Sequence, residues 1–372
     1  MEAGRSRFIG KPLFRFAVIL FVVTLLGTAC GDDDDGGNGG GGGDGELETI
    51  ELGLSGGSLA FYGYFAADTL GYYEDEGYDV NITPTEGSSE AAQQLVAENF
   101  DIAMGVPDAM LAAMQTENLY PFYTYFTSEF RDWVVPADSD IQEIADLEGM
   151  RQGVSTLQSG EVPLVRYLLQ EEGIDPAQDI QIIEVGDQPP SIQAALEQER
   201  VDAFAGSASH VIAINAAGYE TRSILPETFQ SGLPVEGLLA REPHNEDEEL
   251  LAGIARATSK GLLFCQTNPG ACLDVIAQDR PELTEDRALA EETLENYINF
   301  STPPEEDGRL YFSPTSIEGW ETYLGVYSSG DDPVVTDPDA IDLENLVIED
   351  LRDEINDFDY DAVVEEAENY SG

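Results

Sequence analysis

Short segments rich in serine, glycine and acidic residues follow successive apolar stretches of the chain, and these are the places where the sequence could bind a small molecule. Six such segments span residues 55–58, 86–89, 106–108, 155–160, 186–188 and 206–209. Backbone N–H groups, hydroxyls and carboxylates in loops before helices can hold polar groups of a ligand. The candidate ligand-binding residues are Ser55, Gly57, Ser58, Glu86, Ser88, Asp108, Ser155, Thr156, Ser159, Asp187 and Ser207, together with Glu236 farther along the chain.

The same segments contain few basic residues, and this limits which ligand charges they could bind. An oxyanion would normally be held by Arg or Lys through charge-assisted hydrogen bonds. Arg131 is the only basic residue close to a predicted connection between domains, and a surface ion pair would also account for it. The composition of the segments therefore favours a neutral or cationic ligand over a sulfonate or nitrate.

Aromatic residues are dense near these segments. Phe61 and Tyr62 lie on the first predicted helix, Tyr125 on a predicted strand, and Trp133 shortly after it. Such side chains can sandwich a planar heteroaromatic ring whose exocyclic amines donate to nearby carboxylates. Simpler alternatives stay open: core packing for each aromatic, helix capping for the hydroxyls of 155–159, and a solvated surface for any single acid.

Residues suited to catalysis or metal binding are sparse. His210 and His244 are the only histidines, and neither lies in an H-E-x-x-H or nucleophile-elbow context. Ser207 and Ser209 stand close to His210 in the sequence, but such neighbours do not generally orient as a triad. No Walker loop is present, so ATP hydrolysis would belong to a partner. We expect a protein without metal or cofactor that is not an enzyme, with an enzyme on the same scaffold as the alternative.

Alternating strands and helices are predicted to position the candidate loops. Residues 51–54 read as a strand, 59–70 as an apolar helix that Ser58 could cap and Gly71 could end, and 80–82 as the next strand. This order recurs through the middle of the chain and predicts an α/β protein with largely parallel sheets, whose ligands bind at the carboxyl ends of the strands.

The length of 372 residues predicts two domains, because one hydrophobic core rarely serves so long a chain. Connections between them are expected near residues 127 and 234. The expected division is a signal peptide 1–29, a lipid-attached Gly/Asp-rich linker 30–48, a first lobe 49–130 and 235–330, a second lobe 131–234, and an acidic C-terminal extension 331–372 docked on the first lobe.

The N-terminus predicts export. Basic residues precede the apolar run 16–26, which is too short to span a bilayer permanently, and small residues lead to Cys30. This junction resembles the lipobox of bacterial lipoproteins, in which the cysteine is lipidated, although the usual leucine three places earlier is missing; simple secretion is the alternative. The segment 31–45 suits a flexible leash. In an oxidising compartment Cys265 and Cys272 could form a disulfide or remain separate buried thiols.

The charge of the chain is strongly acidic. Asp and Glu number 74 against 16 Lys and Arg, a formal net charge of -58. Self-repulsion at this density destabilises the fold at low salt and is screened at high salt, so the surface suits a salty medium. Nucleic acid is an improbable partner, because neutralising phosphates requires a basic face.

Four stretches carry a family resemblance. They are residues 70–80 (LGYYEDEGYDV), 95–103, 146–154 (DLEGMRQGV) and 195–203, and the first and third are fairly specific together. Over roughly residues 50–300 the chain resembles the extracytoplasmic solute-binding proteins of ABC importers, in the nitrate, sulfonate and thiamine-pyrimidine branch.

The resemblance implies an α/β, two-lobed periplasmic-binding-protein type II fold with two crossing strands, here with a helical C-terminal extension. It implies a small-molecule solute bound between the lobes and an ABC permease and its ATPase as partners. We also expect a monomer, held at the membrane by the lipid anchor that the junction at Cys30 indicates. The aromatic candidates give a weak preference for a thiamine-pyrimidine precursor or a similar heteroaromatic.

Overall fold

The computed structural model describes residues 47–157, 159, 161–226, 229, 233–312, 315–329 and 333–371, all within one compact unit, Gly45–Gly372. The predicted signal peptide 1–29, Cys30 and the linker up to residue 46 lie outside the described residues.

The first sheet has the strand order β2-β1-β3-β10-β4, in which β10 joins four strands from the N-terminal part of the chain. Its strands are β1 (Glu48–Leu54), β2 (Tyr78–Pro84), β3 (Ile102–Gly105), β4 (Leu119–Phe126) and β10 (Glu236–Arg241). β1 pairs in parallel with β2 and β3, whereas β10 runs antiparallel to β3 and β4. β4 is buried along its whole length, as its apolar, aromatic sequence LYPFYTYF dictates. The carboxyl ends of β1 and β3 and the start of β10 consequently share one edge.

The second sheet is built from the middle of the chain in the order β7-β6-β8-β5-β9. Its strands are β5 (Arg131–Pro136), β6 (Arg151–Val154), β7 (Gln181–Glu184), β8 (Ala203–Ser207) and β9 (Thr221–Ser223). β6 pairs in parallel with β7 and β8, as the sequence predicted, but β5 is antiparallel to both β8 and β9. β9 was not anticipated, because the polar triplet TRS carries no strand signal of its own.

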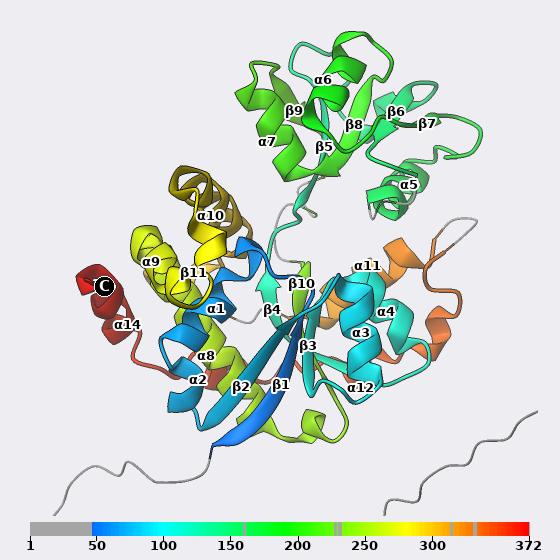
Figure 1. The fold of residues 1–372 in the computed structure, drawn as a ribbon. Coiled ribbons are helices and arrows are strands. Elements are labelled where there is room, and N and C mark those ends of the chain that lie inside the picture. The colour runs from blue at the N-terminus through cyan, green and yellow to red at the C-terminus, as the bar shows by residue number, and fades with distance from the viewer. Residues whose placement is uncertain are drawn as a thin grey trace, which may run out of the picture. The chain divides into compact units, whose positions relative to one another are not determined.

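Helices surround both sheets (Figure 1). Those of the first lobe, which we define by the first sheet, are η1 (Leu59–Phe61), α1 (Tyr62–Thr69), α2 (Tyr72–Asp75), α3 (Ser88–Val96), α4 (Pro107–Met114), η4 (His244–Glu246), α8 (Glu248–Thr267), α9 (Pro269–Asp279), η5 (Pro281–Thr284) and α10 (Arg287–Ser301). Those of the second lobe, defined by the second sheet, are η2 (Ile144–Leu147), α5 (Glu161–Glu171), α6 (Pro189–Glu197) and α7 (Ala208–Ala216). Helices α3, α4, α6 and α7 each follow a strand, which is the predicted alternation.

Two segments cross between the sheets. Residues 127–130 join β4 to β5, and residues 233–235 lead into β10. The second segment is held to the end of β4, where the Val235 N–H donates to the Phe126 carbonyl at 3.1 Å. The first segment is held to α10, where the Thr127 N–H donates to the Phe300 carbonyl at 3.0 Å. The chain therefore has the predicted two-lobed α/β fold with two crossing strands and a helical C-terminal part. The domain boundaries set out above stay predictions.

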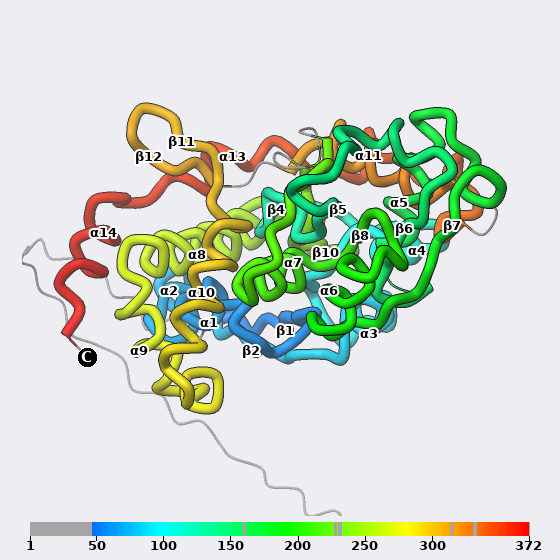
Figure 2. Tube along the Cα trace, turned by 90° about the horizontal axis from the view of Figure 1, so that it is seen from above, coloured from blue at the N-terminus to red at the C-terminus, as the bar shows by residue number. Residues whose placement is uncertain are grey.

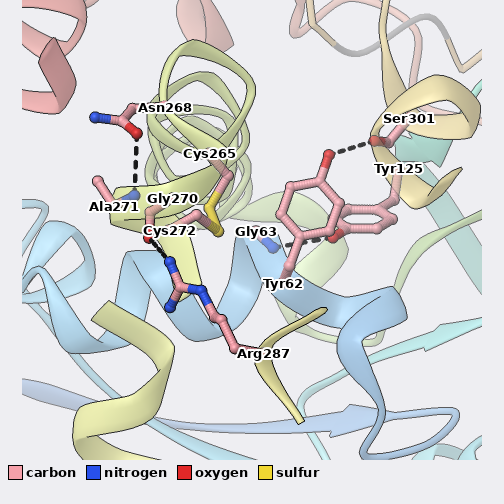
Figure 3. The surroundings of a disulfide bond; sticks show 10 residues. All are labelled: Tyr62, Gly63, Tyr125, Cys265, Asn268, Gly270, Ala271, Cys272, Arg287 and Ser301. Carbon is pink, nitrogen blue, oxygen red and sulfur yellow. Dashed lines mark hydrogen bonds between the residues drawn. A yellow bond between two sulfur atoms is a disulfide. The ribbon is translucent and has the colours of Figure 1, made fainter. Parts of the chain in front are cut away.

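Helix α8 crosses α1 at very short range, because glycines face each other there. A Cβ placed on Gly261 would overlap the backbone carbonyl of Gly63. Beyond this crossing α8 is joined to α9 by a disulfide between Cys265 and Cys272, with a Cα–Cα distance of 4.7 Å (Figure 3). The Asn268 side chain between them accepts from the Ala271 N–H at 3.0 Å and caps α9.

The C-terminal part begins with the short strands β11 (Glu305–Glu306) and β12 (Arg309–Leu310). It continues through α11 (Ile317–Tyr327), η6 (Pro338–Ala340), α12 (Leu343–Leu346), α13 (Arg352–Ile355) and α14 (Tyr360–Asn369). α13 and α14 contact α8, and the Asn268 amide donates to the Ala367 carbonyl at 2.9 Å. Near α2, Glu76 binds Arg256 at 2.6 Å and Lys260 at 2.7 Å.

Candidate functional site

A serine and a glutamate join the first and last strands of the first sheet at the edge where the crossing segments begin. Ser55 follows β1, Glu236 starts β10, and the serine hydroxyl donates to the glutamate carboxyl. Glu236 is only 6% exposed. Burial raises its pKa to about 7, an effect that the Ser55 hydrogen bond and the Arg131 charge oppose and the Asp108 charge increases. The carboxyl therefore changes its protonation state near neutral pH.

A buried ion pair occupies the first crossing segment and the start of β5. The Arg131 Nη1 lies 3.1 Å from Glu129 Oε1 and 3.2 Å from Oε2, and the Arg131 N–H also donates to Oε1 at 3.1 Å. The side chains of Arg131 and Glu129 are 8% and 0% exposed. Burial alone would lower the pKa of Arg131, but the Glu129 charge raises it, so the guanidinium stays charged. The interpretation of Arg131 as a surface pair is wrong, because both partners are buried.

Asp108 faces the same region from the N-terminus of α4, directly after Pro107. Its Oδ1 atom is buried and has no hydrogen-bond partner among the described residues. Its charge raises the pKa values of Glu236 and Arg131, which shows that the three groups lie within electrostatic range. A buried carboxylate oxygen without a donor is costly unless a further donor reaches it.

A cavity of about 480 Å³ opens beside Asp108 in the first lobe. It is lined by Glu86, Gly87, Ser88, Ser89, Glu90, Gln93, Val106, Asp108 and Ala109. Three of the predicted site residues, Glu86, Ser88 and Asp108, thus share one wall. The Ser88 hydroxyl accepts from the Val106 N–H at 3.2 Å, which fixes the start of α3 against the loop before α4.

Loops of the second lobe converge on the start of β5. The β5–β8 register sets Arg131 opposite Ser207, and Ser155 lies beside Gly206, where a Cβ would come within 3.4 Å of its hydroxyl. Ser155 is buried, and its N–H donates to Glu161 Oε1 at 3.0 Å. The structure therefore brings Ser155 and Ser207 together with Arg131.

Several hydroxyl candidates perform local structural tasks. Ser58 accepts from the Ala60 N–H at 3.3 Å and caps η1, and Ser207 accepts from the Ser209 N–H at 3.3 Å and caps α7. The Ser159 hydroxyl donates to the Thr156 carbonyl at 2.6 Å within its own turn. Ser58 and Ser207 thus cap helices, whereas the capping alternative for the hydroxyls of 155–159 stays a prediction.

Three further candidates are exposed to solvent. Glu86 and Asp187 are exposed, and Asp187 accepts only from its neighbour Gln188 at 3.1 Å in the described structure. Gly57 is exposed too, and a Cβ there would come within 3.3 Å of Pro84 at the end of β2.

The aromatic candidates are packed inside the lobes. Phe61 is 5% exposed and borders the loop at Gly56, whereas Tyr62, Tyr125 and Trp133 are 0%, 0% and 1% exposed. Tyr62 shares a hydrogen bond of 2.5 Å with Ser301, and the Tyr125 hydroxyl accepts from the Gly63 N–H at 3.0 Å (Figure 3). Trp133 donates to Gln152 at 2.7 Å. Contact between these rings and a ligand stays a prediction, and in this structure their surfaces are covered by protein.

The serine–histidine group shows no relay of hydrogen bonds in the described structure. The Ser207 and Ser209 hydroxyls lie 2.8 Å apart, and the His210 Nδ1 atom is buried without a partner among the described residues. The described residues also include no group of three or more His, Cys, Asp or Glu side chains suited to a metal ion.

Sequence reasoning missed Glu129 and Tyr323. Glu129 stands two residues before Arg131, and an acid paired with the only nearby base was a signal that could have been used. The Tyr323 hydroxyl donates to Glu129 Oε2 at 3.0 Å. These two residues are 194 positions apart, so no local pattern could have connected them.

Two sheets joined by two crossing segments, with polar loops of both lobes beside the crossing, define the periplasmic-binding-protein class of fold. Within this class, the model of the NMT1/THI5-like family matches residues 58–272. The chain belongs to the NMT1/THI5-like family.

Solved structures of the same fold include three binding proteins. The aliphatic sulphonate binding protein SsuA of Escherichia coli is 15% identical, with a TM-score of 0.58 over 80% of this chain and 98% of that one. The alkanesulfonate-binding protein SsuA of Xanthomonas axonopodis pv. citri, bound to MOPS, is 15% identical, with a TM-score of 0.53 over 82% and 99%. The nitrate-binding protein NrtA of Synechocystis PCC 6803 is 14% identical, with a TM-score of 0.52 over 88% and 99%.

A search of curated protein sequences finds no match to this chain. Among the described residues, no helix combines the length and the apolar character needed to span a bilayer.

Proposed function

We propose that the protein is the extracytoplasmic solute-binding component of an ABC importer, which captures a small molecule between its lobes and delivers it to a permease and its ATPase. The observation that carries this proposal is the meeting of Ser55, Asp108 and Glu236 from the first lobe with Arg131 and Ser207 from the second at the crossing segments. Open α/β folds usually bind their ligands at the carboxyl ends of the strands, and pockets often lie between domains. Family membership and the fold shared with sulfonate- and nitrate-binding proteins support it.

The charges of the site favour a ligand that donates hydrogen bonds. Arg131 is the cation whose charge acts on Glu236, and its guanidinium is already paired with Glu129. Acceptors are left over: the Asp108 Oδ1 atom has no partner among the described residues, and Glu86 lines the same cavity. We therefore favour a neutral or cationic heteroaromatic molecule with exocyclic amines, such as a thiamine-pyrimidine precursor, over a sulfonate or nitrate.

The cellular setting follows from the same proposal. A signal peptide over residues 1–29 would export the chain, lipidation at Cys30 would hold it at the outer face of the cell membrane, and the segment up to residue 48 would tether the folded body, which we expect to act as a monomer. A radiolabelled fatty acid incorporated by the wild-type chain and not by Cys30→Ala would support the anchor. Equal release of both chains into the medium would contradict it.

A thermal-shift panel tests the ligand class. Cytosine, 4-aminopyrimidine, ethanesulfonate and sodium nitrate are added separately to the wild-type protein and to Asp108→Asn. A native-state ligand at 100 times its Kd stabilises the fold by about 2.7 kcal/mol and so raises the melting temperature. We expect an aminopyrimidine to do so and Asp108→Asn to reduce the shift, whereas Asp79→Asn, an exposed acid on β2, keeps it.

The other outcomes separate the alternatives. Stabilisation by ethanesulfonate or nitrate alone would overturn the ligand class and leave the solute-binding function standing. Conversion of the added compound into a product, followed by chromatography, would instead support an enzyme on this scaffold.

A further inference from the structure

Helix α11 contacts both lobes and both crossing segments, although it lies beyond the residues that match the family model. It packs against α4 of the first lobe and α5 of the second, and α5 lies beside it in Figure 2. Such a helix can act on the site through the atoms that contact the crossing segments.

The first contact satisfies a buried charge. Tyr323 is 1% exposed, and its hydroxyl donates to Oε2 of Glu129 in the segment 127–130. Burial, followed by the Glu129 charge, raises the pKa of Tyr323 well above its ordinary value, so the hydroxyl remains a donor. Glu129 thus holds Arg131 with both carboxylate oxygens while Tyr323 supplies the remaining donor. The buried Tyr327 hydroxyl is electrostatically coupled to Arg131 from the next turn of the same helix.

The second contact braces the other crossing segment. A Cβ on Gly319 would overlap the ring of Pro234, so the helix backbone lies directly against residues 233–235. One turn and a half later, Gly325 leaves room: a Cβ there would stay 3.7 Å from Tyr167 of α5. The helix therefore fits closely at the crossing and loosely against the second lobe.

We propose that Tyr323 is a positioning residue for the Glu129–Arg131 pair, and that α11 fixes both crossing segments through Tyr323 and Gly319. The position of Arg131 next to Ser207, and hence the geometry of the candidate site, then depends on a helix outside the family-matched residues. Where it concerns solute binding, this inference rests on the proposed function; the contacts themselves can be tested without any solute.

Hydrogen–deuterium exchange of the full chain measures the positioning directly. Tyr323→Phe keeps the ring and removes only the donor to Glu129. Loss of a hydrogen bond to a charged group weakens the structure by about 1.5 kcal/mol, which corresponds to roughly a tenfold change in an opening equilibrium. We expect the amide of Arg131, which donates to Glu129, to exchange about tenfold faster, with peptides of β1 unchanged.

The matched control is Tyr73→Phe. The Tyr73 hydroxyl is also buried and shares a 2.9 Å hydrogen bond with Thr258, but it lies in α2, away from both crossing segments. Faster exchange at Arg131 in this variant as well would show general loosening and overturn the inference. So would an unchanged rate at Arg131 in Tyr323→Phe.

Two further comparisons distinguish positioning from simple stabilisation. In a Glu129→Gln background the effect of Tyr323→Phe on Arg131 exchange should shrink, because the charge that the hydroxyl serves is gone. Gly319→Ala should speed exchange of the Val235 amide, while Gly325→Ala should not. Equal effects of the two glycine substitutions, or full additivity with Glu129→Gln, would contradict the proposal.

Discussion

Ser55 donates a hydrogen bond to Glu236 across 181 residues of sequence. The contact places a titratable, buried carboxyl at the junction of the first lobe with the crossing segments. Two charged groups act on Glu236, Arg131 at the start of β5 and Asp108 at the start of α4. The Glu236 charge in turn raises the pKa values of three tyrosines, Tyr64 of α1, Tyr125 of β4 and Tyr297 of α10.

Replacing Glu236 by Gln should flatten part of the pH dependence of stability. Burial raises the folded-state pKa from 4.5 to about 7, so the stability associated with this group is complete below pH 4.5 and is lost as pH rises to about 7. A shift of this size corresponds to roughly 3 kcal/mol. We therefore expect the free energy of unfolding of Glu236→Gln, relative to that of the wild type, to increase by this amount between pH 4.5 and 8. Urea unfolding at several pH values measures this difference. A constant difference across the range would contradict the assignment.

Replacing Glu76 by Gln should have the opposite pH dependence. Burial would raise the Glu76 pKa, but hydrogen bonds from Arg256 and Lys260 outweigh it and lower the pKa below its ordinary value. The contribution is therefore present above the unfolded-state pKa and lost as pH falls through the folded-state pKa. We expect a loss of about 2 kcal/mol at pH 7 that disappears in acid. The control is the exposed Glu74 of α2, two residues before Glu76, because Glu74→Gln should leave the stability unchanged.

Gly261→Ala should destabilise the crossing of α1 and α8. The new Cβ would overlap the Gly63 carbonyl and lie 2.9 Å from the Ala67 nitrogen, both of which are backbone atoms that cannot rotate away. Overpacking of this kind costs about 1–3 kcal/mol, against a gain in helix propensity of less than about 1 kcal/mol. Thermal unfolding measures the difference. Gly270→Ala, whose Cβ meets its nearest atom at 3.4 Å, should not be destabilising.

Added NaCl should raise the melting temperature. The formal charge of -58 is spread over a chain with few basic residues, and mutual repulsion falls as the screening length shrinks from about 10 Å at 0.1 M to about 3 Å at 1 M. A 1 kcal/mol gain corresponds to a rise of about 1–2 °C in a chain of 372 residues. KCl and LiCl should act alike if screening is the cause. A melting temperature that stays level or falls would refute it.

The two-lobed fold could be predicted because its signals are local. The strand–loop–helix alternation, the capping serine at residue 58 and the helix end at Gly71, which adopts a φ of 77°, each need only a few neighbouring residues. The sequence could not predict that β5 is antiparallel to its neighbours or that β9 is a strand. Both features depend on pairing with strands that lie far away in the sequence.

The candidate site was only partly predictable. Ser55 lies in the loop after β1 and Asp108 in the first turn of α4, which follows β3. The types of these residues and their positions after strands were enough to predict a polar site. The aromatic residues Tyr125 and Trp133 have the same composition signal whether they stack on a ligand or fill a core, and the structure buries both. The hydroxyl of Tyr323 reaches Glu129 from the far end of the chain, beyond any periodic pattern.

Lys260 is one of two lysines in the sequence, and Lys11 is the other. The Lys260 side chain is 15% exposed, with its ammonium on Glu76 and above the ring of Tyr72. Reagents that acylate primary amines would therefore find almost nothing to modify on the described body. Dyes or sensor surfaces for binding measurements would have to be attached through carboxyl groups or an introduced thiol instead.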